Sequence, residues 1–327
     1  MSCNQIALSV GGTFGHLRPA LEAAISAKGR SFLIGIGLKD SPFLKGINCE
    51  VVSLEGARVF HHLLKSCWQA FIAFQKKNPQ IVISFGSFHS FPATCIALFL
   101  GKPIWVFEPN ATMGKANRFF SFFAHKVLCY DENLVLEFPN RGVLIAPEME
   151  QKEKKAIYTS FGLSENRPVL LIIGGSSGSK FINEWVEKNC HKLKEFQLIH
   201  LVGPKNDPDR WRKVYSSLEI TAYVEPFISN VKEAMQIADI ALTRAGASTL
   251  FELYHYAVPS LIIPFEGAYE HQKQNGLSFL EKGGQGVLVS ENEEEKILSS
   301  LLGLMGLKKD QIFDVKGKKW SDIISLA

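Results

Sequence analysis

Two glycine-rich loops of similar sequence could bring backbone N–H groups close to a phosphate or a sugar. Residues 11–16 read GGTFGH and follow the apolar run 6–10, and residues 174–178 read GGSSG and follow the apolar run 169–173. A tight glycine turn between a strand and a helix presents free N–H groups at the helix N-terminus, where anions bind. Two copies predict two nucleotide-type domains that face each other across a cleft.

His16 and Glu108 are the residues of the first half whose chemistry suits proton transfer. His16 begins the helical pattern after the first loop, and a neutral imidazole there can accept a proton from an attacking hydroxyl. Glu108 follows the strand-like run 104–107 and would either orient His16 or act as the base itself. The ordinary alternatives stay open: a capping or packing histidine, and an exposed or capping glutamate.

Residues 239–252 combine a strand end, a loop of small residues and a helix start. The helix is expected to begin near Ser248, and the free N–H groups there suit a diphosphate. Glu252 lies about one turn further along, where a carboxylate can accept hydrogen bonds from both hydroxyls of a ribose. The alternative is a capping box, because Thr249 and Glu252 fit the pattern S/T-x-x-E.

Other polar loops also follow strand-like runs, where ligands bind at the carboxyl edge of a parallel sheet. One of them is 264–275, and a plain surface loop is the alternative reading of it. Its side chains with donors and acceptors for sugar hydroxyls are His271, Gln272 and Asn275. In the first half, 85–92 and 107–110 follow strands, and we expect them to line the opposite wall of the cleft.

The order of strand-like and helix-like segments predicts an α/β protein with two doubly wound parallel sheets. In the first half, the expected strands are 6–10, 31–36, 50–54, 81–85 and 104–107, and the expected helices include 19–28 and 59–75. In the second half, the expected strands are 169–173, 197–202, 221–224, 240–243 and 259–263. A charged stretch marks the boundary, so we expect domains at 1–147 and 148–327, with a last helix at about 310–327 that crosses back to the first domain.

Composition limits the classes of function. The chain has 327 residues, of which 46% are hydrophobic and 21% charged, as expected for two domains with a core each. The net charge of +4 is too small to indicate nucleic acid, but it is compatible with an anionic substrate or membrane surface. The six cysteines lack zinc-site spacing and predict a reduced compartment. We expect no signal peptide, and 91–107 should be a helix, a turn and a strand rather than a membrane span.

Six segments, in the same order along the chain, resemble motifs of the MurG family of peripheral membrane glycosyltransferases. They are 11–16 (GGTGGH in the family), 86–92 (GGYxSxP), 108–110 (EQN), 174–178 (GGSQG), 244–247 (RSGA) and 271–275 (HQxxN). The resemblance spans essentially the whole chain and implies a GT-B fold of two Rossmann-like domains. It also implies an inverting transfer, with no bound cofactor or metal, of N-acetylglucosamine from UDP-N-acetylglucosamine to the C4 hydroxyl of lipid I, giving lipid II and UDP.

The resemblance further implies roles for individual residues. Those expected to bind UDP-N-acetylglucosamine from the second domain are Ser176, Ile228, Ala247, Ser248, Thr249, Leu250, Phe251, Glu252 and Gln272. Those expected to reach it from the first domain are Thr13, Phe14, Gly15 and Asn110. Within these sets, Ser176 and the backbone of 247–249 would hold the diphosphate, Glu252 the ribose, Ile228 the uracil and Gln272 the sugar. The catalytic candidates are His16, favoured as the base, and Glu108 in reserve, with His89 and Ser90 on the acceptor side.

Three positions depart from the family motifs. Phe14 replaces a glycine, so the backbone there must have a φ that a side chain tolerates. Pro109 replaces a glutamine, and Met149 stands where the family has a donor-binding arginine. Phe14 and Met149 leave open a catalytically weakened scaffold that binds cell-wall enzymes. The nearest enzyme alternative is another GT-B protein that uses a UDP-sugar, such as a UDP-N-acetylglucosamine 2-epimerase or a glycolipid glycosyltransferase.

Apolar side chains rimmed by basic ones predict a surface that docks on an anionic membrane. One segment, 58–77, contains Phe60, Leu63, Leu64, Trp68, Phe71 and Phe74 among Arg58, Lys65, Lys76 and Lys77. A second, 119–123, is flanked by Arg118 and Lys126. The alternative is that these aromatic residues belong to the core. Because lipid I stays in the bilayer, we expect a peripheral protein on the cytoplasmic face of the inner membrane, with other cell-wall and division proteins as further partners and no nucleic acid.

Overall fold

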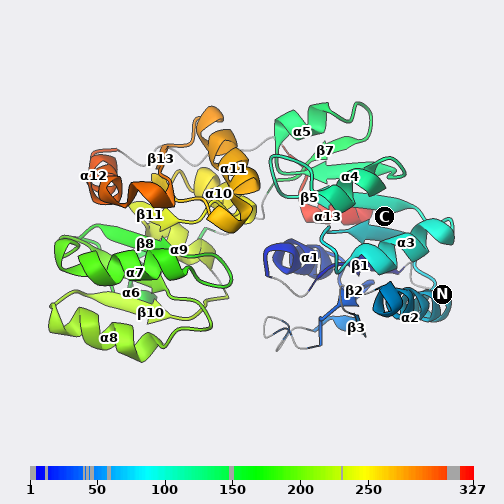
Figure 1. Cartoon of the computed structure of the whole chain (residues 1–327), viewed down its shortest axis with the longest axis horizontal. Coiled ribbons are helices and arrows are strands. Elements are labelled where there is room, and N and C mark those ends of the chain that lie inside the picture. The colour runs from blue at the N-terminus through cyan, green and yellow to red at the C-terminus, as the bar shows by residue number, and fades with distance from the viewer. Residues whose placement is uncertain are drawn as a thin grey trace. The chain divides into compact units, whose positions relative to one another are not determined.

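Two separate α/β units make up the chain. The computed structural model describes residues 5–11, 14–39, 41, 44, 48–56, 60–146, 151–229, 231–307 and 317–327, without the side chains of Phe14, Phe60 and Tyr269. One unit consists of Met1–Glu148 and Lys316–Ala327, and the other of Met149–Val315 (Figure 1). Each unit has its own parallel sheet and its own hydrophobic core.

The first unit is built on a seven-stranded parallel sheet with the strand order β3-β2-β1-β4-β5-β6-β7. The strands are β1 (Ile6–Ser9), β2 (Ser31–Ile36), β3 (Glu50–Leu54), β4 (Ile81–Ser84), β5 (Ile104–Glu108), β6 (Lys126–Cys129) and β7 (Gly142–Leu144). The chain runs outward from β1 to β3, returns to β4 and then runs outward to β7, so the order reverses between β1 and β4. In doubly wound sheets, ligands bind at the carboxyl ends of the strands beside this reversal.

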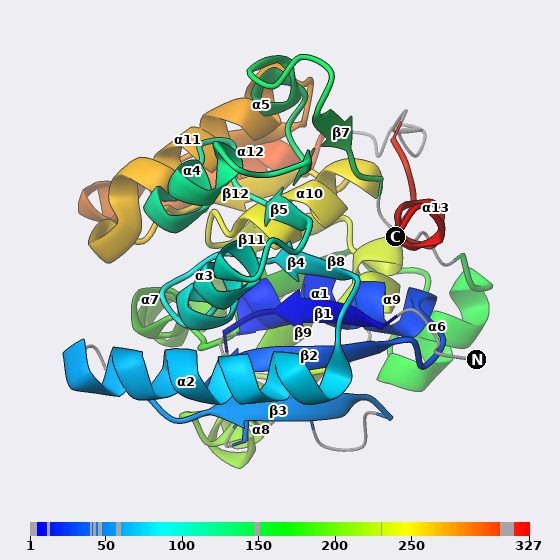
Figure 2. The same cartoon turned by 90° about the vertical axis from the view of Figure 1, so that its right-hand side faces the viewer.

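Helices cover both faces of this sheet. They are α1 (Phe14–Ser26), α2 (Phe60–Lys77), α3 (Phe91–Phe99), α4 (Lys115–Ser121), α5 (Glu132–Leu136) and α13 (Trp320–Ser325). α2 and α3 pack side by side on one face, and α1 lies on the opposite face, where α13 packs against it (Figures 1 and 2). Trp320 of α13 is fully buried, and its ring centroid lies 5.6 Å from that of Phe85 and 5.3 Å from that of Phe107. The end of the chain thus completes the packing of the first unit.

The second unit has a six-stranded parallel sheet with the order β10-β9-β8-β11-β12-β13, and its reversal lies between β8 and β11. The strands are β8 (Val169–Ile173), β9 (Gln197–Leu201), β10 (Ala222–Glu225), β11 (Ile240–Thr243), β12 (Ser260–Ile262) and β13 (Gly286–Leu288). One face packs on α7 (Lys180–Asn189), α8 (Pro208–Ser217) and α12 (Glu294–Leu304). The other packs on α6 (Lys154–Phe161), α9 (Val231–Ile237), α10 (Ala247–His255) and α11 (Tyr269–Glu281).

The structure confirms the predicted fold class, and it corrects several elements. Residues 91–107 form helix α3, a turn and strand β5, as predicted. Strands β6, β7 and β13 were not predicted; β7 and β13 are half-exposed edge strands of three residues, which leave little apolar signal. The helix expected from Pro19 begins at Phe14 instead, so Pro19 lies inside α1.

A buried histidine in the second unit predicts how its stability depends on pH. His200 is fully buried; its Nδ1 lies 2.7 Å from the Tyr215 hydroxyl and its Nε2 lies 3.1 Å from Asn183 Oδ1. Burial lowers the pKa of His200 to about 3, whereas an unfolded histidine has a pKa near 6.5. Between these values the unfolded state binds the extra proton. The contribution of neutral His200 to the free energy of unfolding is therefore fully present above about pH 6.5. It falls by about 1.4 kcal/mol per pH unit as the pH decreases toward 3.

We expect the His200→Gln variant to show a flatter loss of stability between pH 7 and pH 5 than the wild type. Urea unfolding at both pH values, followed by tryptophan fluorescence, measures the difference. His191→Gln is the matched control, because His191 is exposed in the same unit. Equal pH dependence in the wild type and in His200→Gln would show that His200 is not the titrating group.

Candidate functional site

The first turn of α1 presents His16 in a defined tautomer. Its Nδ1 lies 2.8 Å from the carbonyl oxygen of Phe85, which follows β4. Because a carbonyl oxygen can only accept, Nδ1 must carry the hydrogen, and in the neutral ring Nε2 keeps its lone pair. The His16 side chain is partly exposed. The structure thus supplies a histidine whose Nε2 can accept a proton.

The glycine loop before His16 packs against the loop that follows β4. A Cβ at Gly11 would approach Ser87 Oγ and His89 Cβ to 2.9 Å, a distance too short for real contacts. Gly15 is exposed, and a Cβ there would meet nothing within 4 Å. Phe14 is the first residue of helix α1, so the residue that replaces the family glycine has an ordinary helical backbone. Thr13 and Met149 lie outside the described residues.

Glu108 is buried and organises a turn. It is 1% exposed, and its carboxylate accepts four hydrogen bonds: two from Asn110 at 3.2 and 2.6 Å, one from the Gly114 backbone at 2.9 Å and one from Asn117 at 2.9 Å. The expectation that Glu108 orients His16 is wrong, since no hydrogen bond joins the two in the described part of the chain. Of the ordinary alternatives, exposure is wrong, because Glu108 is buried; its carboxylate contacts the N–H of Gly114, the N-cap residue of α4.

Ser90 and His89 differ in their access to the surface. Ser90 is fully buried at the N-cap of α3, and its hydroxyl donates to the carbonyl of Ser87 at 3.0 Å. Its own carbonyl accepts from the Ser9 hydroxyl at 2.8 Å. The expectation that Ser90 faces an acceptor substrate is therefore corrected: its side chain lies under the loop. His89 is partly exposed above it.

The second glycine loop connects β8 to α7 in a conformation that depends on its glycines. Gly178 has φ +74°, and a Cβ there would lie 2.6 Å from the carbonyl oxygen of Val202. A Cβ at Gly174 would lie 2.3 Å from the backbone nitrogen of Ser179. Ser179 caps α7 by accepting from the Ile182 N–H at 3.2 Å. Ser176 lies half-buried within this loop.

The start of α10 has no side-chain cap at its N-cap residue in the described part of the chain. The N-cap is Gly246, and the first intrahelical bond runs from the Leu250 N–H to the Gly246 carbonyl at 2.9 Å. The N–H groups of 247–249 thus precede the intrahelical ladder and lie half-buried. The alternative of a Thr249–Glu252 capping box is wrong, because Thr249 lies inside the helix. Glu252 follows one turn later and is 5% exposed.

The remaining residues expected to bind UDP-N-acetylglucosamine differ in which of their groups could contact a ligand. Leu250 is a core residue, so only its backbone could meet a ligand, and the ring of Phe251 lies against that of His255 at 4.4 Å. Ile228 is partly buried after β10. Gln272 accepts from the Phe265 N–H at 2.9 Å through Oε1, which leaves its amide nitrogen for a ligand.

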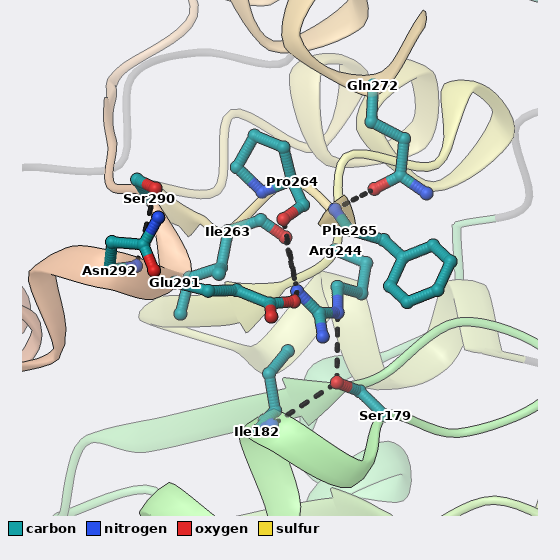
Figure 3. A network of polar contacts seen from close by, with 10 residues as sticks. All are labelled: Ser179, Ile182, Arg244, Ile263, Pro264, Phe265, Gln272, Ser290, Glu291 and Asn292. Carbon is teal, nitrogen blue, oxygen red and sulfur yellow. Dashed lines mark hydrogen bonds and ion pairs between the residues drawn. The ribbon is translucent and has the colours of Figure 1, made fainter. Parts of the chain in front are cut away.

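Arg244, at the end of β11, connects these loops, although sequence reasoning assigned it no contact. Its Nε donates to Ser179 Oγ at 2.9 Å, and its Nη1 donates to the carbonyl oxygens of Ile263 and Pro264 at 3.3 and 3.1 Å (Figure 3). Asn275 makes a similar connection, since its Nδ2 donates to the Ala245 carbonyl at 3.1 Å. The motif 244–247 marked Arg244, but its neighbours come from distant segments.

Comparison with known proteins decides the family. Residues 169–322 match the glycosyltransferase family 28 C-terminal domain, and residues 6–129 match the glycosyltransferase family 28 N-terminal domain. A UDP-N-acetylglucosamine–N-acetylmuramyl-(pentapeptide) pyrophosphoryl-undecaprenol N-acetylglucosamine transferase of Chlamydia pneumoniae is 30% identical over 324 residues, covering 90% of this chain and 87% of the relative. The chain belongs to glycosyltransferase family 28.

Further likenesses agree with this membership in family 28. The transferase of the same name from Chlamydia trachomatis serovar D is 32% identical over 307 residues, covering 88% of this chain and 85% of the relative. Among solved structures, Acinetobacter baumannii MurG superposes with a TM-score of 0.70 at 20% identity, covering 98% of both chains. A UDP-GlcNAc 2-epimerase from Methanocaldococcus jannaschii superposes with a TM-score of 0.63 at 14% identity, also covering 98% of both chains. These superpositions show the GT-B fold alone, which a transferase and an epimerase share.

In the ranges that the structure describes, no helix combines the length and the apolar character that crossing a membrane demands.

Proposed function

We propose that this protein transfers N-acetylglucosamine from UDP-N-acetylglucosamine to the C4 hydroxyl of the N-acetylmuramyl group of lipid I, forming lipid II and UDP with inversion. The observation that carries the proposal is the match, at 30 and 32% identity over about nine-tenths of the chain, to chlamydial transferases named for this reaction. The superpositions alone would leave an epimerase equally open.

The second unit would hold the donor. The N–H groups at the start of α10 and the loop containing Ser176 suit the diphosphate, because helix N-termini favour negative charge. Glu252 would accept hydrogen bonds from the ribose hydroxyls, and the amide nitrogen of Gln272 would donate to the sugar. The backbone at Ile228 would meet the uracil. Helix N-termini can also stabilise the charge that develops on the leaving UDP.

The first unit would hold the acceptor and supply the base. In the step, the acceptor oxygen forms a bond to the anomeric carbon, and its proton passes to Nε2 of His16. The bond between the anomeric carbon and the diphosphate oxygen breaks, and its electron pair leaves with UDP. His16 suits this role because its Nδ1–H is held by the Phe85 carbonyl, which leaves Nε2 as the basic atom. Glu108 suits an organising role for the turn that carries Asn110, because four donors already occupy its carboxylate. Thr13, Phe14, Gly15 and Asn110 would reach the donor, and His89 the acceptor.

One assay tests the proposed reaction. The purified protein is incubated with UDP-N-acetylglucosamine and a short-chain lipid I analogue, and UDP release is followed with and without the analogue. UDP release that requires the acceptor supports the transferase. Formation of UDP-N-acetylmannosamine without acceptor would instead support the epimerase, and donor binding without turnover would support the scaffold.

A surface of the first unit is suited to an anionic membrane, where lipid I is held. The large side chains exposed on α2, at the end of α3 and around the end of α4 are Leu64, Trp68, Ile72, Phe99, Phe119, Phe122 and Phe123. Exposed basic residues near them in sequence are Lys65, Lys76, Lys115 and Arg118. The core alternative holds for Phe74 and Phe120, which are buried at 2% and 0% exposure. The protein would bind there peripherally, on the cytoplasmic face of the inner membrane, where other cell-wall and division proteins would meet it.

We expect a Trp68→Ala/Phe122→Ala variant to bind anionic vesicles at least about tenfold more weakly than the wild type. The loss of each ring removes about 1 kcal/mol or more of the binding free energy that its apolar burial provides. Co-sedimentation with phosphatidylglycerol vesicles measures binding, and added salt should weaken the binding of the wild type. Leu302→Ala, at an exposed leucine of the second unit, is the matched control. Wild-type binding that does not respond to lipid charge or salt would contradict the proposal.

A further inference from the structure

The guanidinium of Arg244 joins three loops at the carboxyl edge of the second sheet. β11 lies between β8 and β12, so Arg244 at its end reaches the loops on both sides. On one side it bonds to Ser179, which ends the glycine loop, and on the other to the carbonyls of Ile263 and Pro264. One side chain thus sets the spacing of the loops after β8, β11 and β12.

Two aromatic rings enclose the Arg244 side chain. Its guanidinium carbon lies 5.6 Å from the centroids of both Phe181, on α7, and Phe265, after β12. Arg244 as a whole is 7% exposed. A guanidinium keeps its charge in such surroundings and needs an opposite charge close by. The lowered pKa of Arg244 has burial as its main cause, and Glu291 opposes that effect.

Glu291 supplies an opposite charge to Arg244. It lies outside all the segments that the sequence predicted to bind UDP-N-acetylglucosamine. It forms an ion pair with Arg244, and its side chain is 16% exposed (Figure 3). A capped 3-10 turn, Glu291–Glu293 between β13 and α12, carries it. The turn is held by Ser290, whose hydroxyl accepts from the Asn292 N–H at 3.3 Å and whose N–H donates to Glu293 at 3.2 Å. Glu291 is therefore directed at Arg244 by local structure as well as by charge.

We infer that Glu291 is a positioning residue for the donor. Through its ion pair with Arg244, it holds the loop of Ser176, the start of α10 at Ala247–Thr249 and the segment 263–265, which bonds to Gln272, at the spacing that a UDP-sugar requires. The inference rests on the proposed function for the identity of that donor. Removal of the Glu291 carboxylate leaves the buried guanidinium without its ion-pair partner, and Glu266 acts on it only through a charge interaction. Arg244 would then turn toward water and release its bonds to the loops after β8 and β12, while the acceptor side in the first unit keeps its structure.

The test compares Glu291→Gln with Glu295→Gln, a matched control four residues further along, where the glutamate is exposed. We expect Glu291→Gln to raise the Kd and KM for UDP-N-acetylglucosamine about tenfold, equivalent to about 1.4 kcal/mol, and to leave the KM for the lipid I analogue within about twofold. Glu295→Gln should match the wild type. Calorimetric titration with UDP-N-acetylglucosamine gives the Kd and the fraction of competent protein. Glu291→Asp, which keeps the charge, should recover part of the lost affinity.

The outcomes separate the inference from the proposed function. A wild type that binds the UDP-sugar but does not transfer it contradicts the function and leaves the Kd comparison to decide the role of Glu291. A Glu291→Gln protein with a lower melting temperature but an unchanged Kd would show a purely structural role and overturn the inference. If Glu291→Gln does not fold, Glu291→Asp decides, because its shorter side chain weakens the ion pair with Arg244. An unchanged Kd then overturns the inference, and a raised Kd supports it.

Discussion

His16→Asn is expected to lower kcat by about 10² to 10⁴-fold, the range that a general base contributes, with little change in KM for UDP-N-acetylglucosamine. The amide nitrogen of asparagine occupies the place of Nδ1, so the variant can keep the hydrogen bond to the Phe85 carbonyl that anchors His16 at 2.8 Å. It has no counterpart of Nε2, the atom proposed to take the acceptor proton. Acceptor-dependent UDP release at saturating concentrations of both substrates measures kcat.

Two further variants separate the loss of the base from damage to the loop. His16→Ala removes both the base and the anchor, so it should be at least as impaired as His16→Asn. His125→Asn is the matched control, because His125 is an exposed histidine of the same unit. Turnover of His16→Asn within about threefold of the wild type, far below the general-base range, would exclude His16 as the base. His89 would then become the next candidate for the base, because hydrogen-bond donors already occupy the Glu108 carboxylate.

Glu252→Gln is expected to raise KM for UDP-N-acetylglucosamine about a hundredfold, since it weakens two charged hydrogen bonds to the ribose at a cost of about 2.7 kcal/mol. Glu252 is 5% exposed one turn into α10, and glutamine has almost the same volume, so the change leaves no cavity. The kcat at saturating donor should fall far less, because the ribose contact exists before the transfer step as well as during it. Initial rates over a range of donor concentrations measure both constants.

A double comparison tests whether Glu252 acts through the ribose. The wild type should lose affinity for a donor analogue without the ribose 2′-hydroxyl, whereas Glu252→Gln should show a smaller additional loss, because the partner of that hydroxyl is already weakened. Glu281→Gln, an exposed position on α11 in the same unit, serves as the control. Independent and fully additive losses would place the ribose elsewhere and return Glu252 to a structural role.

These two predictions assign different kinetic signatures to the two units. His16, in the first unit, should change kcat, and Glu252, in the second, should change the donor KM. Glu291 should change donor affinity in the same direction as Glu252 but by a smaller factor, because it acts only through Arg244. Measuring all three with one assay therefore tests the division of labour that the GT-B fold suggests.

The fold and the positions of the functional loops could be predicted from the sequence because their causes are local. Buried parallel strands such as β2 and β8 read as continuous apolar runs, and their predicted bounds match the structure. Glycine at positions such as Gly178 marks a turn that only a residue without a side chain can form, with φ +74°. The order of six motifs then identified the family, which the comparisons confirm.

What only the tertiary structure decided is which side chains reach one another. Glu108 looked like a reserve base until packing brought four donors to its carboxylate, and Ser90 looked accessible until the loop after β4 folded over it. The possible capping box at Thr249 does not form, because α10 begins at Ala247 with Gly246 as its N-cap and Thr249 lies inside the helix. The pair of Arg244 and Glu291 left no sequence signal, since its partners lie far apart in the chain and meet only where the sheet aligns the ends of its strands. Local patterns specify strands, turns and helices, whereas contacts between distant side chains follow from how those elements pack.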